Sequence, residues 1–353
     1  MKPIFVLNLG STSTKVAIFK DKSSVESTTL RHSADALSKY PHVLDQIEFR
    51  KEAIETWLKT VNHSFDDFEL LCIRGALLKP IASGIYQINQ EMVEELKASR
   101  LNAHVSAVGI ILGDLWAKTF NKQAIFLNAP STDELAPLAR YTGIKGINRR
   151  SGFHALNQKQ IALEYAQSIS KPYRDLNLIV CHMGGGISVG VHHQASVIDV
   201  NHALEGEGPM SPERSGALSV RNAIELFKHV NYDETQFYKL IAGNGGLVSH
   251  TGISDVKTLF EQSTSDLKIN EVLDAMIYQI AKEIGAMSTV VKGKVDAILL
   301  TGGLAYSTTL IDRLKARVDW IAPVFVYPGE DEMYALAMGA YRYLEGQETL
   351  KEY

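Results

Sequence analysis

The chain has 353 residues, of which 45% are hydrophobic and 22% are charged, and its formal net charge at pH 7 is −4; this is the composition of a globular protein long enough for two domains. Charges of both signs are dispersed, no apolar stretch approaches the roughly 18 residues that span a bilayer, and no signal-peptide pattern follows Met1, which argues against nucleic-acid or membrane partners and against secretion. The two cysteines, Cys72 and Cys181, lie in apolar runs, so we expect buried free thiols and a cytoplasmic protein.

The first predicted element is a β-hairpin over residues 4–19. An apolar run leads into a turn that is rich in Gly, Ser and Thr and closes on Lys15. Backbone N–H groups and short hydroxyls in such a turn form a concave donor surface that suits phosphate oxygens. A purely structural hairpin would show the same local pattern, and the sequence G-x-x-x-x-G-K-[ST] of a Walker loop does not occur here.

The rest of the N-terminal half alternates predicted strands and helices. We expect strands at 28–31, 70–73 and 124–127, and helices at 45–61, 91–99 and 104–118. Arg74 follows the second of these strands and Asn128 follows the third. Ligands of open α/β sheets bind at the carboxyl ends of strands, which makes both residues site candidates. A single Arg in this position is also commonly the partner of a surface ion pair.

A polar junction at residues 148–154 contains the predicted domain boundary, near residue 152. A helix is expected beyond it at 155–166, and a second strand–glycine turn–strand unit follows at 178–191. When Gly184 is aligned with Gly10, Val180 falls on Val6 and His182 falls on Asn8. Two such units indicate a duplicated domain and favour phosphate binding for both hairpins.

The second half continues with a Gly- and Pro-rich loop at residues 205–216 that contains Arg214. Loops of this length are usually functional or disordered, and the ordered neighbours of this one favour function. We expect helices at 220–230, 235–242 and 273–291, a strand and loop at 197–203, strands at 295–300 and 324–327, and a loop at 250–255. A third glycine-rich turn at Gly302 and Gly303 follows a buried strand, and a final helix runs from residue 331 towards residue 353.

Charged and polar side chains gather at these turns. The candidates are the cations Lys15, Arg74 and Arg214, the imidazoles His154 and His182, and the acids Glu332 and Asp133. Phosphoryl transfer needs positioning and charge neutralisation more than covalent chemistry, so this set suits a nucleotide held between two similar domains. A histidine at a strand end is more often structural, and the inference therefore rests on the whole set.

Several stretches are long and unusual: VLNLGSTSTKVAIF, RHSADALSKYPHVLDQIEFRKEAI, GFHALNQK, LNLIVCHMGGGISVGVH, EGEGPMSPERSGAL, DAMIYQIAKEIGAM, VDAILLTGGLAYS and APVFVYPGEDEMYALAMGAYRYL. They resemble the acetate and butyrate kinases of the actin, Hsp70 and sugar-kinase superfamily. The similarity to butyrate kinases is closer and extends over essentially the whole chain. It implies reversible transfer of a phosphoryl group from ATP, with Mg²⁺, to a short-chain carboxylate, and butanoate is the expected substrate.

The resemblance also implies a domain organisation. The fold would be α/β, with two ribonuclease H-like domains of the duplicated actin-like ATPase type and the active site in the cleft between them. Residues 1–152 would form an N-terminal carboxylate-kinase domain, and residues 153–332 a C-terminal nucleotide-binding domain. The C-terminal helix, at 333–353, would pack back on the first domain. The family further implies a homodimer or a higher homo-oligomer.

Individual site residues follow from the resemblance as expectations. Those that match the two phosphate hairpins are Asn8, Ser11, Ser13 and Lys15 in the first, and His182, Gly184, Gly185 and Gly186 in the second. Those expected to neutralise the transferring phosphoryl group are Arg74, Arg214, His154 and His182. Those expected elsewhere in the site are His104 and Asn128 for the substrate, Asp255 for the nucleoside, Gly302 and Gly303 for adenosine, and Glu332 for magnesium.

Two positions depart from the family pattern. Asn128 stands where related kinases usually have Asp, and an amide cannot take up a proton as a carboxylate does, so we assign it no general-base role. Lys257 stands where Arg is expected near the nucleoside, and Lys cannot stack on adenine or bond in the same bidentate way.

Two alternatives remain open from the sequence. The first is a kinase for acetate, propionate or a branched acid such as isobutyrate, because neighbouring chain lengths differ little in binding free energy. The second is a sensor or chaperone on the same fold, since a fold does not fix a function.

Overall fold

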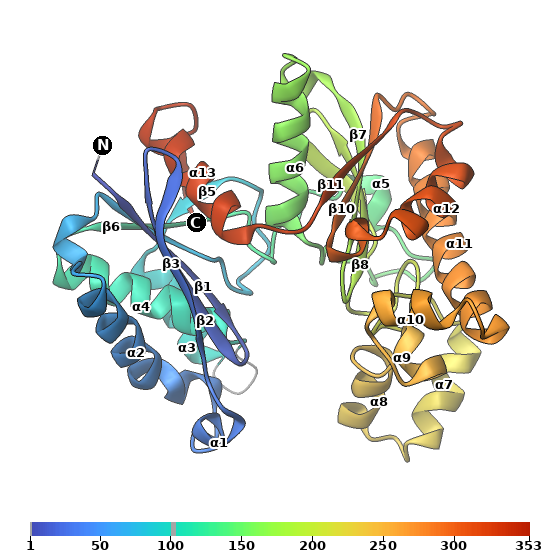
Figure 1. Cartoon of the computed structure of the whole chain (residues 1–353), viewed down its shortest axis with the longest axis horizontal. Helices are drawn as coiled ribbons and strands as arrows, with labels where there is room; N and C mark the ends of the chain where they lie inside the picture. Colours follow the sequence, from blue (N-terminus) through green and yellow to red (C-terminus); the bar gives the residue numbers. More distant parts are fainter. Residues whose placement is uncertain (1, 100–103) are drawn as a thin grey trace. The chain divides into compact units, whose positions relative to one another are not determined.

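The computed structural model describes residues 2–99 and 104–353. Its contacts divide the chain into two compact units (Figure 1): unit 1 comprises Met1–Thr132 and Asp331–Tyr353, and unit 2 comprises Asp133–Glu330. The domain boundaries near residues 152 and 332 that the sequence suggests stay a prediction. Within the described residues, no helix is both long and apolar enough to cross a membrane.

Unit 1 is built on a mixed sheet with the strand order β12-β5-β6-β4-β1-β2-β3. The strands are β1 (Ile4–Gly10), β2 (Ser13–Lys20), β3 (Ser23–Arg31), β4 (Leu70–Ile73), β5 (Ile85–Gln87), β6 (Gln123–Leu127) and β12 (Leu350–Lys351). β1 pairs antiparallel with β2 and parallel with β4, and β4 pairs parallel with β6. The carboxyl ends of β1, β4 and β6 therefore share one edge, where Asn8, Arg74 and Asn128 lie.

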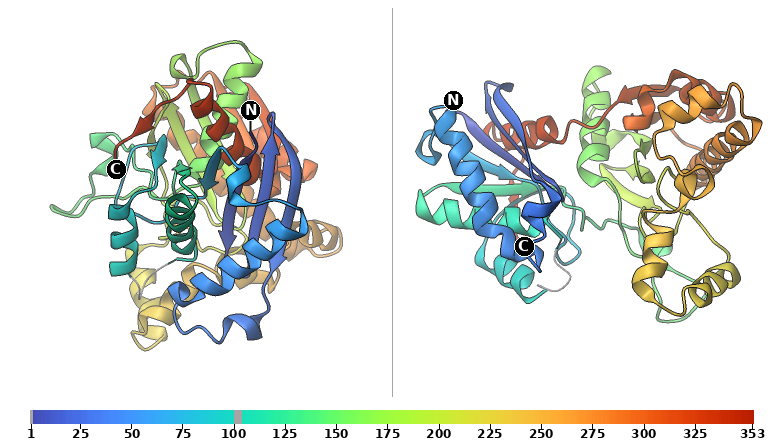
Figure 2. Two further views of the ribbon diagram at one scale, coloured as in Figure 1. Left: turned by 90° about the vertical axis from the view of Figure 1, so that its left-hand side faces the viewer. Right: turned by 60° about the horizontal axis from the view of Figure 1, so that its bottom comes forward.

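Helices cover both faces of this sheet. They are α1 (Ala34–Leu37), α2 (Ile47–Thr60), α3 (Gln90–Ala98), α4 (Ser106–Thr119) and α13 (Glu332–Leu344), joined by the short 3₁₀ helices η1 (Val43–Gln46) and η2 (Phe65–Asp67). Alternate side chains of β1, such as Phe5 and Leu7, join a core with α2 and α4. On the other face the Cys72 thiol donates to the carbonyl of Leu336 in α13, at 3.3 Å. Figure 2 shows α2 and α13 on opposite sides of the sheet.

Unit 2 repeats this plan with the strand order β11-β10-β7-β8-β9. The strands are β7 (Asn177–Met183), β8 (Ile187–His193), β9 (Ser196–Val200), β10 (Ala297–Gly302) and β11 (Val324–Pro328). β7 pairs antiparallel with β8 and parallel with β10, as β1 does with β2 and β4. The order therefore matches β6-β4-β1-β2-β3 strand for strand, which confirms the predicted duplication.

The helices of unit 2 also divide between two faces. They are α5 (Pro137–Arg140), α6 (Ala155–Ser168), α7 (Val220–His229), α8 (Glu234–Ile241), α9 (Gly246–Thr251), α10 (Val256–Gln262), α11 (Leu267–Val290) and α12 (Thr308–Val318), with the 3₁₀ helices η4 (Tyr173–Asp175) and η5 (Gly303–Tyr306). α6 packs on Leu178 and Val180 of β7, whereas α11 and α12 pack on Ile179 and Cys181. Neighbouring residues of β7 face opposite sides of the sheet, and helices cover both sides. The strand is therefore packed against helices on both sides, which explains why its sequence is a continuous apolar run.

The structure corrects several predicted elements. The final helix ends at Leu344, because Gly346 turns the chain at φ +72° and Leu350 then pairs with Ile85. α9 overlaps the predicted loop at residues 250–255 and has no counterpart among the predicted helices, since its first residue is a glycine, which is typical of a turn. α12 has no counterpart among the predicted elements. β3 begins at Ser23, ahead of the predicted residue 28. Its first residues are mostly polar and exposed, so they lack the apolar pattern that predicts a strand.

Other predictions are confirmed. Both hairpins, the helix α2 and the long helix α11 form where the apolar periodicity indicates. Cys72 and Cys181 are free and buried. The glycine-rich segment at residues 205–216 contains no helix or strand, as its composition predicts.

Candidate functional site

Glu332 joins two other predicted site residues at the strand edge of unit 1. It is the first residue of α13, and Asp331 caps the helix by accepting from the Tyr334 N–H. One carboxylate oxygen accepts from the Asn8 amide at 2.6 Å, and the other lies 3.0 Å from Nη2 of Arg74. The Arg74 and Glu332 side chains keep 28% and 23% of their surface exposed, so the cluster can be reached by a ligand.

The turn of the first hairpin lies next to this cluster in sequence and in the sheet. Asn8 pairs with Lys15 across β1 and β2, which puts both side chains on the same face of the sheet. Ser11 and Lys15 are exposed, and Ser13 is half-buried. The structure thus brings a hydroxyl-bearing turn and a lysine to the same end of β1 as Asn8.

His104 and Asn128 surround the same sheet edge. Partial desolvation of the imidazole, together with the charge of Arg74, lowers the pKa of His104. Its Nδ1 accepts from the Ser106 N–H at 3.3 Å and bonds with the Ser106 hydroxyl at 2.9 Å. Asn128 adopts φ +43°, and its Oδ1 accepts from the Gly84 N–H at 3.0 Å. The Asn128 side chain therefore holds the loop at Gly84 through Oδ1, and its Nδ2 stays available to a ligand.

In unit 2, two predicted histidines stack on each other. The rings of His154 and His182 have centroids 3.8 Å apart and planes inclined by 11°. His154 bonds to the Ser188 hydroxyl at 2.9 Å, and Nδ1 of His182 donates to Oδ1 of Asn157 at 2.8 Å. Ser188 faces His182 across the β7–β8 pair, so both strands of the second hairpin hold this stack.

The surroundings of His182 keep it neutral. The ring is 1% exposed, and its burial, reinforced by the charge of Arg214, lowers its pKa to about 3. A carboxylate oxygen of Glu330 lies 3.3 Å from Nε2, but burial and Arg214 outweigh its attraction for a proton. His182 therefore carries no charge at pH 7 in this structure, and its expected role toward a phosphoryl group stays a prediction that would depend on hydrogen bonding.

Arg214 lies directly against the glycine turn of the second hairpin. A Cβ atom built on Gly186 would be 1.5 Å from Nη1 of Arg214, so only glycine leaves room for the guanidinium. Nη1 donates to the carbonyl of Ala203 at 2.8 Å, and the Ser211 hydroxyl ties the same loop to the carbonyl of Gly185. Burial lowers the pKa of Arg214, although Glu213 opposes this shift. The predicted hairpin and the predicted arginine thus form one structural unit.

The third glycine turn adjoins the second hairpin, and Asp255 lies at the start of the helix α10. Gly302 adopts φ +90°, and a Cβ atom there would be 2.3 Å from the carbonyl oxygen of Met183, so the turn requires glycine. A Cβ atom at Gly303 would meet open space. Asp255 caps α10, where its carboxylate accepts from the N–H and the hydroxyl of Thr258; these bonds lower its pKa.

Three residues that sequence reasoning missed take part in the histidine cluster. Asn157 orients His182, Ser188 bonds to His154, and Glu330 faces Nε2 of His182. Glu330 could have been found, because it lies two residues before Glu332 in the same acidic run. Asn157 and Ser188 carry no local signal, since only the fold brings them to the histidines.

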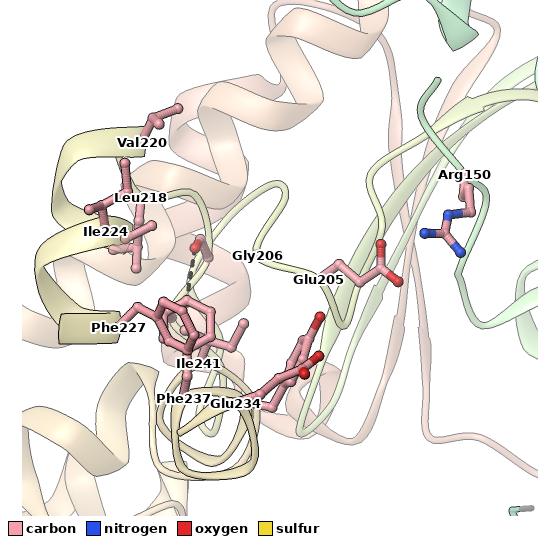
Figure 3. Close-up of a pocket in the computed structure, with 14 residues that line it drawn as sticks. Arg150, Glu205, Gly206, Leu218, Val220, Ile224, Phe227, Glu234, Phe237 and Ile241 are labelled. Atoms are coloured by element: carbon pink, nitrogen blue, oxygen red, sulfur yellow. Dashed lines mark hydrogen bonds between the residues drawn. The ribbon is translucent and has the colours of Figure 1, made fainter. Parts of the chain in front are cut away.

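A separate pocket of about 600 Å³ lies in unit 2, between the loop at residues 205–216 and the helices α7 and α8. In Figure 3 the apolar side chains Leu218, Ile224, Phe227 and Phe237 gather on one side, away from Arg150. None of the predicted site residues lines this pocket.

Comparisons with known proteins show what the fold and the sequence of this chain are similar to. The structure is similar to Porphyromonas gingivalis acetate kinase, with a TM-score of 0.80 and 16% identity over 98% of this chain and 100% of that one. It is similar to a propionate kinase from Francisella tularensis subsp. tularensis SCHU S4, with a TM-score of 0.75 and 15% identity over 96% and 99% of the two chains. A ROK family protein from Streptococcus pneumoniae TIGR4 gives a TM-score of 0.52 and 11% identity over 98% and 99%.

These structural similarities establish the fold, which is α/β with two ribonuclease H-like domains of the actin-like ATPase type. A sequence model of the Acetokinase family matches residues 122–318, which is more than half of the chain. The chain therefore belongs to the acetokinase family, and it is a phosphotransferase that uses a carboxyl group as acceptor.

Proposed function

We propose that this protein is a butyrate kinase, which transfers the γ-phosphoryl group of ATP reversibly to butanoate and gives butanoyl phosphate and ADP. The observation that carries a phosphoryl-transfer site is the cluster in which Glu332 joins Asn8 and Arg74 at the carboxyl ends of β1 and β4. The preference for butanoate is supported by the similarity of the long sequence stretches to butyrate kinases.

The proposed step is a direct in-line transfer. A carboxylate oxygen of butanoate attacks the γ-phosphorus, a new O–P bond forms, and the bond to the bridging oxygen breaks with its electron pair left on ADP. The acid is already ionised at pH 7, so no general base is required. Arg74 and Arg214 would donate to the equatorial oxygens and oppose the charge that they carry in the transition state.

The other residues would act by hydrogen bonding and position. The turn at Ser11 and Ser13 and the turn at Gly184–Gly186 would bind phosphate oxygens through N–H groups and hydroxyls. Neutral His182 would orient His154, which would contact the transferring group. His104 and Asn128 would line the carboxylate side, and Gly302 and Gly303 would approach the nucleoside.

The residues of unit 1 fit a magnesium ion. Mg²⁺ in kinases is usually held by one or two carboxylates together with phosphates and waters. Among the described residues no group of three or more His, Cys, Asp or Glu could hold a metal by itself, but Glu332 offers one partly exposed carboxylate beside the phosphate-type turn. When bound, the ion would offset part of the negative charge of the phosphates. Asp255 would be available to a nucleoside only through the oxygen that does not cap α10.

A coupled assay of ADP formation over straight and branched acids of two to six carbons tests the proposal. We expect the highest kcat/KM with butanoate, because one methylene is worth about 1–3 kcal/mol in a fitted apolar pocket. A higher kcat/KM for acetate, propionate or isobutyrate would replace butanoate but keep the reaction. No turnover with any acid, despite binding of ATP, would favour a sensor on the same fold.

Light scattering on purified protein tests the homodimer that we also propose.

A further inference from the structure

Arg50, in α2, is the buried charge of unit 1 that the proposed function leaves unused. Its side chain is 0% exposed, and burial lowers its pKa to about 10, which still leaves it charged at pH 7. Within the described part of the chain, no ion pair includes Arg50, and its hydrogen-bond acceptors are all neutral. A buried guanidinium without a carboxylate partner is costly, and it needs an explanation.

The guanidinium binds the underside of the first hairpin. Nη2 donates to the carbonyl of Ser11 at 2.9 Å, and Nη1 donates to the carbonyl of Ser13 at 3.0 Å. Nη1 also donates to the Thr14 hydroxyl at 3.0 Å, and Nε donates to Oε1 of Gln46 at 3.0 Å. A single planar fork therefore spans the whole turn between β1 and β2.

His32 completes this arrangement. Its backbone N–H donates to the carbonyl of Thr12 at 2.9 Å, and its Nε2 bonds with the Thr14 hydroxyl at 2.9 Å. Because Thr14 accepts from Arg50, its own proton is free to go to His32, and burial together with the charge of Arg50 lowers the pKa of His32. The carbonyls of Ser11, Thr12 and Ser13 are thus all held by buried donors.

We propose that Arg50 is a positioning residue for the phosphate hairpin, and that its buried positive charge is complemented by the phosphates of the bound nucleotide. The three carbonyls are the groups of the turn that would repel an anion, and Arg50 and His32 hold them on the buried side. The inference rests on the proposed function, because it takes the β1–β2 turn as a phosphate-binding site.

The variant Gln46→Glu tests the charge without disturbing the geometry. The new carboxylate keeps the acceptor for Nε of Arg50 and supplies the negative charge that the site lacks. We expect the Kd for Mg-ADP, measured by calorimetry, to rise about tenfold, while the thermal midpoint of the free protein stays the same or rises. Gln46→Met is the matched control, because it removes the bond and adds no charge, and its Kd should stay within about twofold of wild type.

Two outcomes of this comparison would overturn the proposal. An unchanged Kd in Gln46→Glu would mean that Arg50 only holds the fold. An equal rise in Gln46→Glu and Gln46→Met would mean that the hydrogen bond matters and the charge does not.

Arg50→Lys tests the fork separately. Lysine keeps the charge but cannot reach the carbonyls of Ser11 and Ser13 with one planar group. We expect the KM for ATP to rise about tenfold or more, whereas Ile54→Val, on the buried face of the same helix, should lower stability without changing this KM. A wild-type KM in Arg50→Lys would contradict the positioning role. Wild-type protein that bound no Mg-ADP would overturn the proposed function along with this inference, but normal wild-type binding unaffected by these variants would overturn this inference alone.

Discussion

The imidazole rings of His154 and His182 lie face to face, with centroids 3.8 Å apart. Two positively charged rings at this distance would repel each other, so at most one of them can be protonated on both nitrogens. Burial and the neighbouring Arg214 lower the pKa of His182 to about 3, which makes His182 the neutral partner. His182 is therefore the neutral member of the stack, and its ring orients the ring of His154.

The first prediction follows from this low pKa. The unfolded chain takes up a proton on His182 below about pH 6.5, while the folded protein does not do so until about pH 3. Stability is therefore fully present above pH 6.5 and is lost as the pH falls through this window, by up to about 1.4 kcal/mol per pH unit. Urea unfolding at pH 7.5 and pH 5 should show a smaller loss in His182→Gln than in wild type. His229→Gln, at an exposed histidine of α7, should behave as wild type; equal losses in all three proteins would refute the assignment.

The second prediction concerns Arg74. Arg74→Ala removes a guanidinium that pairs with Glu332 at 3.0 Å and that would oppose the charge of the transferring group. We expect kcat to fall by about 10³-fold or more, with little change in the KM for ATP. Arg174→Ala, at an arginine whose side chain is 79% exposed, is the matched control and should keep wild-type kcat. Unchanged turnover in Arg74→Ala would remove this residue from the mechanism.

Local sequence patterns predict the hairpins and the strand edge well. The apolar runs and glycine turns give both hairpins, and the position of Arg74 after a buried strand gives its place beside Asn8. Glu332 joins them from the far end of the chain, and only the family resemblance connects it to them. The stretch at residues 246–255 and the tail after Leu344 are harder to predict, because glycines there either begin a helix or end one.

The environment of a side chain could not be predicted from its type. His182 and Arg214 belong to one set of residues expected to neutralise a phosphoryl group, yet the buried position of His182 beside Arg214 makes it neutral. The carboxylate of Asp255 caps the helix α10. Arg50 lies in a helix whose apolar periodicity does not indicate a buried charge. These properties depend on tertiary packing, which one sequence does not encode in any short pattern.

The third prediction tests the departure at Asn128. Asn128→Asp keeps an acceptor for the Gly84 N–H, so the fold should tolerate it, and kcat should change only a few-fold because the substrate acid needs no base. Asn128→Ala would leave that N–H without its partner and place alanine at φ +43°, which should lower the free energy of unfolding by about 1–3 kcal/mol. Kinetics and urea unfolding measure both effects. A large gain in kcat in Asn128→Asp would show that this chain lacks a catalytic carboxylate.

The fourth prediction uses the contact between the glycine turn and Arg214. In Gly186→Ala the new Cβ would overlap Nη1 of Arg214, and the flexible arginine side chain would move away while the backbone stays in place. We therefore expect kcat to fall by about tenfold or more with only a small change in Tm. Gly285→Ala is the matched control, because its Cβ meets nothing within 4 Å in the helix α11; it should keep full activity and gain up to about 1 kcal/mol of stability. If Gly186→Ala retained wild-type kcat, the position of Arg214 against this turn would have no part in the reaction.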